Sequence, residues 1–332
     1  MILINSSPKD ALQIFQPFLP IYVPIGIGCL LAIAEREGIN AHVVDEQIEA
    51  DPLSEINRLI QDLTPPYIFG FSVLTASLKS AIELSRILKE RYPDSIICFG
   101  GVHPTAAPDE ILGFPQVDFV LRGEGEYSLL ALYRAIKSRG DYTAIHGLSY
   151  RKNGLLIHNE RLPPIMDLDA LPSFPYHRFT SPRYDLGFVV SSRGCPYNCI
   201  FCSNQITTGK RYRSRSAESV VAEIDLLRKN YNKRQVIFLD DNLLVNRERI
   251  AHLISTIKVQ GLHQEMSFSF QARGDNVDRE LLRSLYDAGF RSVFFGLETA
   301  SEKLMKLVCQ SALKIDPPSA SKIDPPQAVV FS

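Results

Sequence analysis

Short runs of apolar and β-branched residues recur along the first 140 positions and alternate with longer stretches of helical spacing. The apolar runs cover residues 2–4, 42–44, 68–71, 96–99 and 119–121. Helical spacing between them covers residues 26–37, 53–63, 78–91 and 127–137. Strands that alternate with helices in this way are typical of a parallel sheet covered on both faces. We therefore predict an α/β domain with a doubly wound parallel sheet over residues 1–140.

The pattern changes at about residue 145. Two short segments, at residues 148–151 and 155–158, flank Lys152-Asn153-Gly154, which is typical of a β-hairpin. The segment that follows is rich in proline and has no helical period. We therefore expect residues 141–185 to form a hairpin and a proline-rich linker between two domains.

Strands and helices alternate again after the linker. Strand-like runs cover residues 188–192, 236–239, 266–270 and 292–296. Helical spacing covers residues 217–230, 247–258 and 278–288. Repeated βα units of this size predict a second α/β domain, a partial (β/α) barrel, over residues 186–308.

Residues 309–332 form a low-complexity tail. The segment Lys314-Ile315-Asp316-Pro317-Pro318 recurs eight residues later, beginning at Lys322. Pairs of prolines cannot continue a barrel strand, because proline lacks the backbone N–H that the ladder needs. We expect this tail to be disordered or to result from a truncation.

The composition excludes several classes of protein. The 332 residues are 45% hydrophobic and 22% charged, which is close to the globular average. Because 36 Lys and Arg face 37 Asp and Glu, no basic excess favours nucleic-acid binding. No apolar run reaches the roughly 18 residues of a membrane span, and the N-terminus lacks the basic region of a signal peptide. We therefore expect a cytoplasmic protein with no nucleic-acid partner and no membrane span.

Three of the six cysteines lie within eight residues, directly after a predicted strand. They are Cys195, Cys199 and Cys202, whereas Cys29, Cys98 and Cys309 stand alone. The spacing C-x3-C-x2-C puts three thiols on one tight loop. Zinc normally takes four ligands in two separated pairs, whereas a [4Fe–4S] cluster held by three thiolates keeps one iron open. A few buried cysteines or a redox pair is the alternative interpretation.

This loop resembles the signature of the radical S-adenosylmethionine (SAM) superfamily, with Phe201 in the aromatic position before the last cysteine. The resemblance implies that the three cysteines hold a [4Fe–4S] cluster whose open iron binds the amino and carboxylate groups of SAM. It also implies that one electron cleaves SAM to methionine and a 5′-deoxyadenosyl radical, which abstracts hydrogen from a substrate. Phe201 either lies near the adenine of SAM or has only a packing role.

Polar residues follow three of the strands predicted for the second domain, at the mouth of the barrel where active sites gather. They are Asp240, Asp241, Arg273 and Glu298, and the resemblance implies that groups at these places face SAM. Two alternatives stay open: Asp241 caps the next helix, or Arg273 and Glu298 form a structural ion pair.

The first domain carries no G-x-G-x-x-G after its first strand, so the fingerprint of a dinucleotide site is absent. Instead, Ser72-Val73-Leu74 and, further on, Gly100-Gly101 resemble the Ser-x-Leu and Gly-Gly elements of cobalamin-binding, Rossmann-like domains. The axial histidine of one branch of that family has no counterpart here. His103, directly after the glycine pair, either touches the corrin or caps a turn.

Together the two domains resemble the cobalamin-dependent radical SAM family. The resemblance implies three cofactors, namely a [4Fe–4S] cluster, SAM and cobalamin, and methylation of an unactivated carbon on a small-molecule substrate. It also implies an electron donor such as flavodoxin or ferredoxin. The barrel has about four of the roughly six βα units usual in that family. The alternatives are an oxidative cyclase or rearrangement enzyme acting on a porphyrin-type substrate, a truncated chain that binds cobalamin without catalysis, and a radical SAM enzyme without cobalamin.

Overall fold

The computed structural model describes residues 1–8, 21–299 and 301–309. The chain divides into two compact units. The first comprises Met1–Ile165 and Leu171–Asp185, and the second comprises Met166–Ala170 and the chain from Leu186 on. The low-complexity tail predicted from residue 309 on lies, apart from its first residue, outside the described residues.

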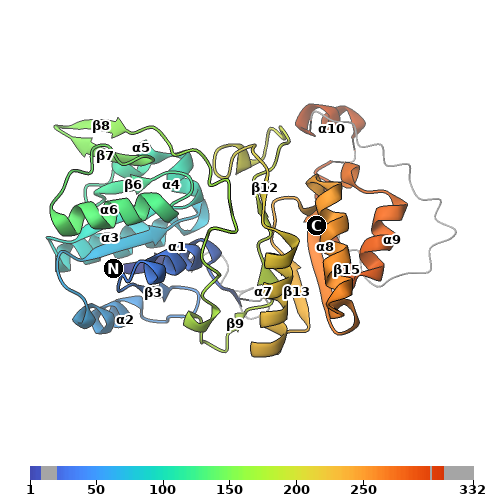
Figure 1. Ribbon diagram of the computed structural model, residues 1–332. Helices are drawn as coiled ribbons and strands as arrows, with labels where there is room; N and C mark the ends of the chain where they lie inside the picture. Colours follow the sequence, from blue (N-terminus) through green and yellow to red (C-terminus); the bar gives the residue numbers. More distant parts are fainter. Residues whose placement is uncertain (9–20, 300, 310–332) are drawn as a thin grey trace. The chain divides into compact units, whose positions relative to one another are not determined.

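The centre of the first unit is a single sheet (Figure 1). Its seven described strands follow the order β3-β1-β4-β5-β6-β7-β8. The strands are β1 (Ile2–Asn5), β3 (His42–Asp45), β4 (Ile68–Ser72), β5 (Ile96–Gly100), β6 (Phe119–Leu121), β7 (Leu148–Lys152) and β8 (Leu155–His158). The first five in this order pair in parallel, and β7 and β8 are antiparallel.

Helices cover both faces of this sheet because its strands bury both sets of alternating side chains. Ile2 and Ile4 pack with α2 (Pro52–Leu59), α3 (Leu78–Arg91) and α5 (Pro108–Leu112) in one apolar cluster. Leu3 lies between them in β1 and therefore points to the opposite face. There α1 (Ile25–Arg36) and α6 (Glu126–Ser138) lie side by side. The doubly wound sheet expected from the sequence is confirmed.

The hairpin belongs to the first sheet and not to a separate linker. β7 pairs with the edge strand β6, with Phe119 opposite Tyr150 and Leu121 opposite Leu148. This pairing buries Leu148 and Tyr150 and satisfies one edge of β6. Further along the chain, β9 (Tyr184–Asp185) pairs with β2 (Ile21–Tyr22). The first unit therefore extends well past residue 140.

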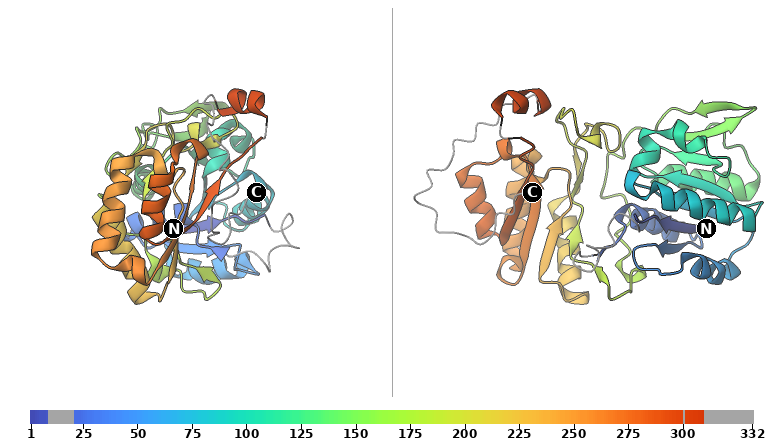
Figure 2. Two further views of the ribbon diagram at one scale, coloured as in Figure 1. Left: turned by 90° about the vertical axis from the view of Figure 1, so that its right-hand side faces the viewer. Right: turned by 180° about the vertical axis from the view of Figure 1, so that it is seen from behind.

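The second unit contains a parallel sheet, whose described strands follow the order β10-β13-β14-β15. The helices of this unit lie on one side of the sheet (Figure 2). The strands are β10 (Phe188–Val189), β13 (Gln235–Phe238), β14 (Ser267–Ala272) and β15 (Phe290–Phe295). The helices are α7 (Ala217–Asn230), α8 (Arg247–Val259) and α9 (Arg279–Asp287), followed by α10 (Glu302–Cys309). This is the predicted partial barrel.

Aromatic side chains form much of the core under these helices. The rings of Phe238 and Phe268 lie 5.5 and 5.2 Å from the ring of Phe290, between centroids. Because the polar residues of β14 alternate with its buried phenylalanines, they face the other side of the sheet. Across all described residues, no helix combines the length and the apolar character needed to cross a membrane.

Candidate functional site

The three clustered cysteines lie on a long loop closed at its base by a short antiparallel ladder. The strands of this ladder are β11 (Ser192–Arg193) and β12 (Arg213–Ser214), so the strand expected over residues 188–192 divides into β10 and β11. Gly194 has a φ of 84°, and a side chain there would clash with the carbonyl oxygen of Arg211. Since only glycine fits both conditions, Gly194 fixes the turn into the cysteine segment.

All three cysteines line one pocket of about 200 Å³ in the second unit. Its walls also contain four of the residues singled out in the sequence, namely Phe201, Asp241, Arg273 and Glu298. Asp241, Arg273 and Glu298 follow the carboxyl ends of β13, β14 and β15. The carboxyl ends of parallel strands are where barrel folds build their sites, so parallel pairing gathers residues that are far apart in the sequence.

The structure corrects the expectation that Asp240 faces SAM. Its side chain is fully buried and does not line the pocket. The carboxylate accepts hydrogen bonds from the backbone N–H of Ser191 at 2.6 Å and from the hydroxyl of Ser192 at 2.8 Å. The pKa of Asp240 is raised above its usual value, because the effect of burial outweighs the lowering by the bonds from Ser191 and by the charge of Arg249.

The partners of Asp240 make it a structural anchor for the base of the cysteine loop. Arg249 of α8 donates to the hydroxyl of Ser191 at 2.7 Å and to the hydroxyl of Tyr212 at 3.2 Å. Ser191 and Tyr212 stand just outside β11 and β12, the two strands that begin and end the loop. A buried carboxylate with this many donors is satisfied internally.

Replacing Asp240 with alanine is expected to lower the free energy of unfolding of the second unit by about 3 kcal/mol, because several buried donors lose their acceptor and the Arg249 charge loses a nearby opposite charge. Urea unfolding of the full chain measures the change. The matched control is Glu218→Ala, whose carboxylate forms an exposed ion pair with His252 and should change stability by less than about 1 kcal/mol. Equal effects in the two variants would contradict the anchoring role.

Asp241 holds the cysteine loop from the pocket side. Its Oδ2 accepts hydrogen bonds from the backbone N–H of Gly194 at 3.0 Å and from the hydroxyl of Thr208 at 3.1 Å. The side chain that caps α8 is Asn246, which accepts from the backbone N–H of Arg249. Of the two interpretations left open for Asp241, the geometry therefore favours a place at the site over a helix cap.

Arg273 forms an ion pair with Asp275. Its Nε and Nη2 donate to the two carboxylate oxygens of Asp275 at 2.9 and 2.6 Å. Glu298 lies on the pocket wall and has a φ of 55°, a left-handed conformation that costs energy for any residue except glycine. Phe201 also lines the pocket and is 52% exposed, so its ring has a free face.

The donor set of the pocket fits an iron–sulfur cluster. Within the residues that the structure describes, no three His, Cys, Asp or Glu side chains converge on a single point as one metal ion would require. A four-iron cube does not require convergence, because each thiolate binds a different iron. Burial raises the pKa of the Cys195 thiol, and the backbone N–H of Tyr197 lowers it. Around Cys199, the nearest cation is Arg273.

Other polar residues line this pocket and were not singled out from the sequence, among them Gln271 and Asp275. Gln271 donates from Nε2 to the backbone carbonyl of Asp240 at 2.9 Å, which ties β14 to the end of β13. Its signal was present in the alternation of β14, where Ser269 and Gln271 oppose the buried Phe268 and Phe270. Asp275 had a weaker signal, because an acidic residue two positions after an arginine is common.

In the first unit, the two cobalamin-like elements lie on neighbouring strands. Ser72, the last residue of β4, pairs with Gly100, the last residue of β5. The following loops interlock, because Val73 donates its backbone N–H to Gly100 and accepts from His103. Gly101 has a φ of 99°, and a Cβ there would lie 2.9 Å from the backbone nitrogen of Val73. Leu74 is 55% exposed beside this edge.

His103 lies in the short helix α4 (Val102–Ala106), one residue beyond its start, and not in a turn. Its Nδ1 shares a hydrogen bond of 3.1 Å with the hydroxyl of Thr75, and its Nε2 lies 3.5 Å from a carboxylate oxygen of Glu110. The imidazole is therefore held between the loops that follow β4 and β5. The structure brings His103 to the same edge as Ser72 and Gly101.

The carboxyl edge of β1 also fits a polar ligand. β3 lies on one side of β1 and β4 on the other, so the chain reverses its direction of progress across the sheet there, and open α/β sheets bind ligands at such a point. Directly after β1, the Ser6 hydroxyl is buried without a hydrogen-bond partner in the described residues. The backbone N–H of Ser6 donates to Ser72. An orphaned buried hydroxyl beside Ser72 matches the demands of a bound polar group.

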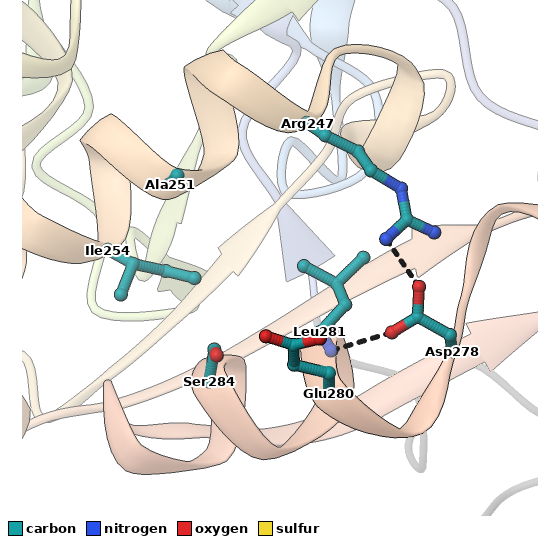
Figure 3. A pocket seen from close by; sticks show the side chains of 7 residues that line it. All are labelled: Arg247, Ala251, Ile254, Asp278, Glu280, Leu281 and Ser284. Atoms are coloured by element: carbon teal, nitrogen blue, oxygen red, sulfur yellow. Dashed lines mark hydrogen bonds and ion pairs between the residues drawn. The ribbon is translucent and has the colours of Figure 1, made fainter.

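A second pocket in the second unit, of about 330 Å³, lies between α8 and α9 (Figure 3). Arg247 and Asp278 form an ion pair across one end of it, and Asp278 also accepts from the backbone N–H of Leu281 at 2.8 Å. None of the residues singled out in the sequence lines this pocket. Because Arg247 and Asp278 bind each other, we assign this pocket to helix packing.

Two family models match the chain, in the order that the sequence predicts. The B12 binding domain matches residues 16–133, and the radical SAM superfamily matches residues 189–314. Each model falls on one of the two α/β units.

Curated relatives match both units. An uncharacterized methyltransferase of Pyrococcus horikoshii is 29% identical over 291 residues, which is 86% of this chain and 62% of the relative. An anaerobic magnesium-protoporphyrin IX monomethyl ester cyclase of Synechocystis is 26% identical over 319 residues, which is 92% of this chain and 62% of the relative. The chain thus spans less than two thirds of the length of these relatives.

Among solved structures, the fold is similar to that of the cobalamin-dependent SAM radical enzyme OxsB with aqua-cobalamin and SAM bound. The TM-score is 0.78 at 21% identity, and the match covers 94% of this chain and 46% of that one. This similarity confirms the expected fold class.

Proposed function

Because its two units match the models of the B12 binding domain and of the radical SAM superfamily, we propose that the chain binds a [4Fe–4S] cluster, SAM and cobalamin and methylates an unactivated carbon of a small molecule. One observation carries the proposal. Three thiols on one loop share a pocket with polar side chains from the carboxyl ends of β13, β14 and β15. When bound, the cluster supplies the electron that cleaves SAM to methionine and a 5′-deoxyadenosyl radical, and cobalamin carries the methyl group.

The residues of the second unit have separate tasks in this proposal. Cys195, Cys199 and Cys202 hold the cluster. Asp241 and Glu298 present carboxylates to a ligand whose amino and sulfonium groups are positive, which is the favourable pairing of charges. Phe201 offers an exposed aromatic face for the adenine ring. Asp240 acts only through the loop that it anchors.

The residues of the first unit would hold cobalamin at the carboxyl edge of the sheet. Ser6 and Ser72 place two hydroxyl-bearing residues at the ends of adjacent strands, β1 and β4. Gly101 lets the loop after β5 approach the loop after β4 closely. The proposal includes an electron donor such as flavodoxin or ferredoxin, which supplies the electron to the cluster. It also includes a reducing compartment such as the cytoplasm, because the thiols that hold the cluster must stay reduced.

An oxidative cyclase is the second candidate, because magnesium-protoporphyrin IX monomethyl ester cyclases are among the curated relatives. The two functions differ in the fate of SAM. Methyl transfer leaves S-adenosylhomocysteine, whereas cyclisation uses SAM only as a source of radicals and leaves none.

The experiment that tests the proposal is SAM cleavage by the full chain, reconstituted anaerobically with iron, sulfide and hydroxocobalamin and reduced with dithionite. We expect both 5′-deoxyadenosine and S-adenosylhomocysteine by liquid chromatography. Formation of 5′-deoxyadenosine alone favours the cyclase. Absence of both products from protein that holds about four irons per chain would contradict radical SAM chemistry in this chain.

A further inference from the structure

The guanidinium of Arg273 is fixed on one edge by Asp275. Nε and Nη2 donate to the two carboxylate oxygens at 2.9 and 2.6 Å, which is the two-pronged arrangement that fits a guanidinium fork. Both groups are shielded from solvent, with side-chain exposures of 16% for Arg273 and 19% for Asp275. A partly buried bidentate pair of this kind holds the arginine in one orientation.

The flat face of the same guanidinium lies over the ring of Tyr197, with 4.0 Å between Cζ and the ring centroid. The Tyr197 ring is itself held, because Asn276 donates from Nδ2 to its hydroxyl at 2.8 Å. Tyr197 lies between Cys195 and Cys199 on the cysteine loop. The stack therefore joins the end of β14 to the middle of that loop.

The remaining nitrogen of the fork points at a cysteine of the loop. Nη1 donates to Sγ of Cys199 at 2.9 Å. Asp275 holds one edge of the guanidinium and Tyr197 holds one face. These contacts fix the direction of the bond from Nη1 to Cys199. Asp275 already takes the Nε/Nη2 edge of the fork.

From this geometry we infer that Arg273 is a positioning residue that raises the reduction potential of the cluster by donating a hydrogen bond to the Cys199 thiolate. The inference rests on the proposed function. Reduction adds negative charge to the cluster and its sulfurs, so a donor aimed at one sulfur stabilises the reduced form more than the oxidised form. The charge of Arg273 is balanced by Asp275, which leaves the directed N–H as the main effect.

The test measures the one-electron potential of the reconstituted full chain without SAM, by anaerobic redox titration followed through the electron paramagnetic resonance of the reduced cluster. Arg273→Met removes the donor and Arg273→Lys keeps the charge without the fork. The matched control is Arg283→Met, which removes an exposed positive charge from α9 in the same unit. Iron is counted in every variant.

We expect Arg273→Met to keep its iron and to favour the oxidised cluster at least tenfold at a fixed potential, a shift of about 59 mV to more negative values for one electron. The cluster potential of Arg273→Lys should shift in the same direction, and the cluster potential of Arg283→Met should equal that of the unaltered chain. An unchanged potential in Arg273→Met, or a normal potential in Arg273→Lys, would overturn the inference. So would loss of iron from both variants, which would make Arg273 a structural part of the loop. If the unaltered chain assembles no cluster, the proposed function fails instead.

Discussion

Replacing Cys199 with alanine is expected to lower bound iron by more than about tenfold, from about four atoms per chain, and to abolish the visible absorption of the cluster. The physical reason is that three thiolates are the whole protein ligand set of such a cluster, and two cannot hold a cube in place. Iron analysis and optical spectra after anaerobic reconstitution measure the effect. Cys199 makes its side-chain contact with Arg273 in the pocket, so its loss removes a ligand without opening the core.

The control for this substitution is Cys29→Ala. Cys29 is a half-buried cysteine on α1 of the first unit. The Cys29→Ala variant should keep the full cluster if Cys195, Cys199 and Cys202 are the ligands. Retention of four irons by the Cys199 variant would refute the assignment of these three cysteines as the ligands.

Replacing Gly101 with alanine is expected to abolish retention of cobalamin while the iron content stays unchanged. Gly101 has a φ of 99°, and a Cβ would lie 2.9 and 3.0 Å from the backbone nitrogen and oxygen of Val73. The left-handed conformation alone costs a residue other than glycine about 1–2 kcal/mol. The clash adds to this cost and pushes apart the two loops that follow β4 and β5.

Gly38→Ala is the matched control, because it adds the same methyl group at another glycine of the first unit with positive φ, outside the residues assigned to cobalamin. Gly38 has a φ of 66°, and a Cβ there would meet nothing within 4 Å. Cobalt per chain after gel filtration should stay within about twofold of the unaltered chain in this variant. Loss of iron together with cobalt in Gly101→Ala would mean that the substitution unfolds the chain, contrary to a local role at the cobalamin edge.

Much of the fold was predictable because both units are built from buried parallel strands. Such strands form apolar runs that stand out between amphipathic helices. The hairpin was recognised from Asn153 and Gly154, both of which have positive φ. Its place in the first sheet was not, because the pairing of β7 with β6 depends on contacts between residues about 30 positions apart.

The candidate site was predictable in its members and less so in their roles. The cysteine spacing and the polar residues after β13, β14 and β15 were found from the sequence, and parallel pairing brings most of them to one pocket. Asp240 and Asp241 are adjacent, yet one is buried under Ser191 and the other lines the pocket. Nothing in a sequence distinguishes such neighbours, because opposite faces of the chain meet different partners.

The partner of Arg273 was equally hidden. Glu298 was a plausible partner because it follows the neighbouring strand, β15, but Asp275 is two residues away and accepts from both Nε and Nη2 of the guanidinium. The local turn after β14 decides this choice. It is a geometric property of residues 273–276 that neither composition nor spacing records.

The measurement that tests the central claim most directly is a count of iron and cobalt in the full chain after anaerobic reconstitution with iron, sulfide and hydroxocobalamin. The account predicts about four irons and about one cobalt per chain. Cobalt without iron would contradict the cluster pocket and leave a chain that only binds cobalamin. Iron without cobalt would contradict the cobalamin edge of the first sheet.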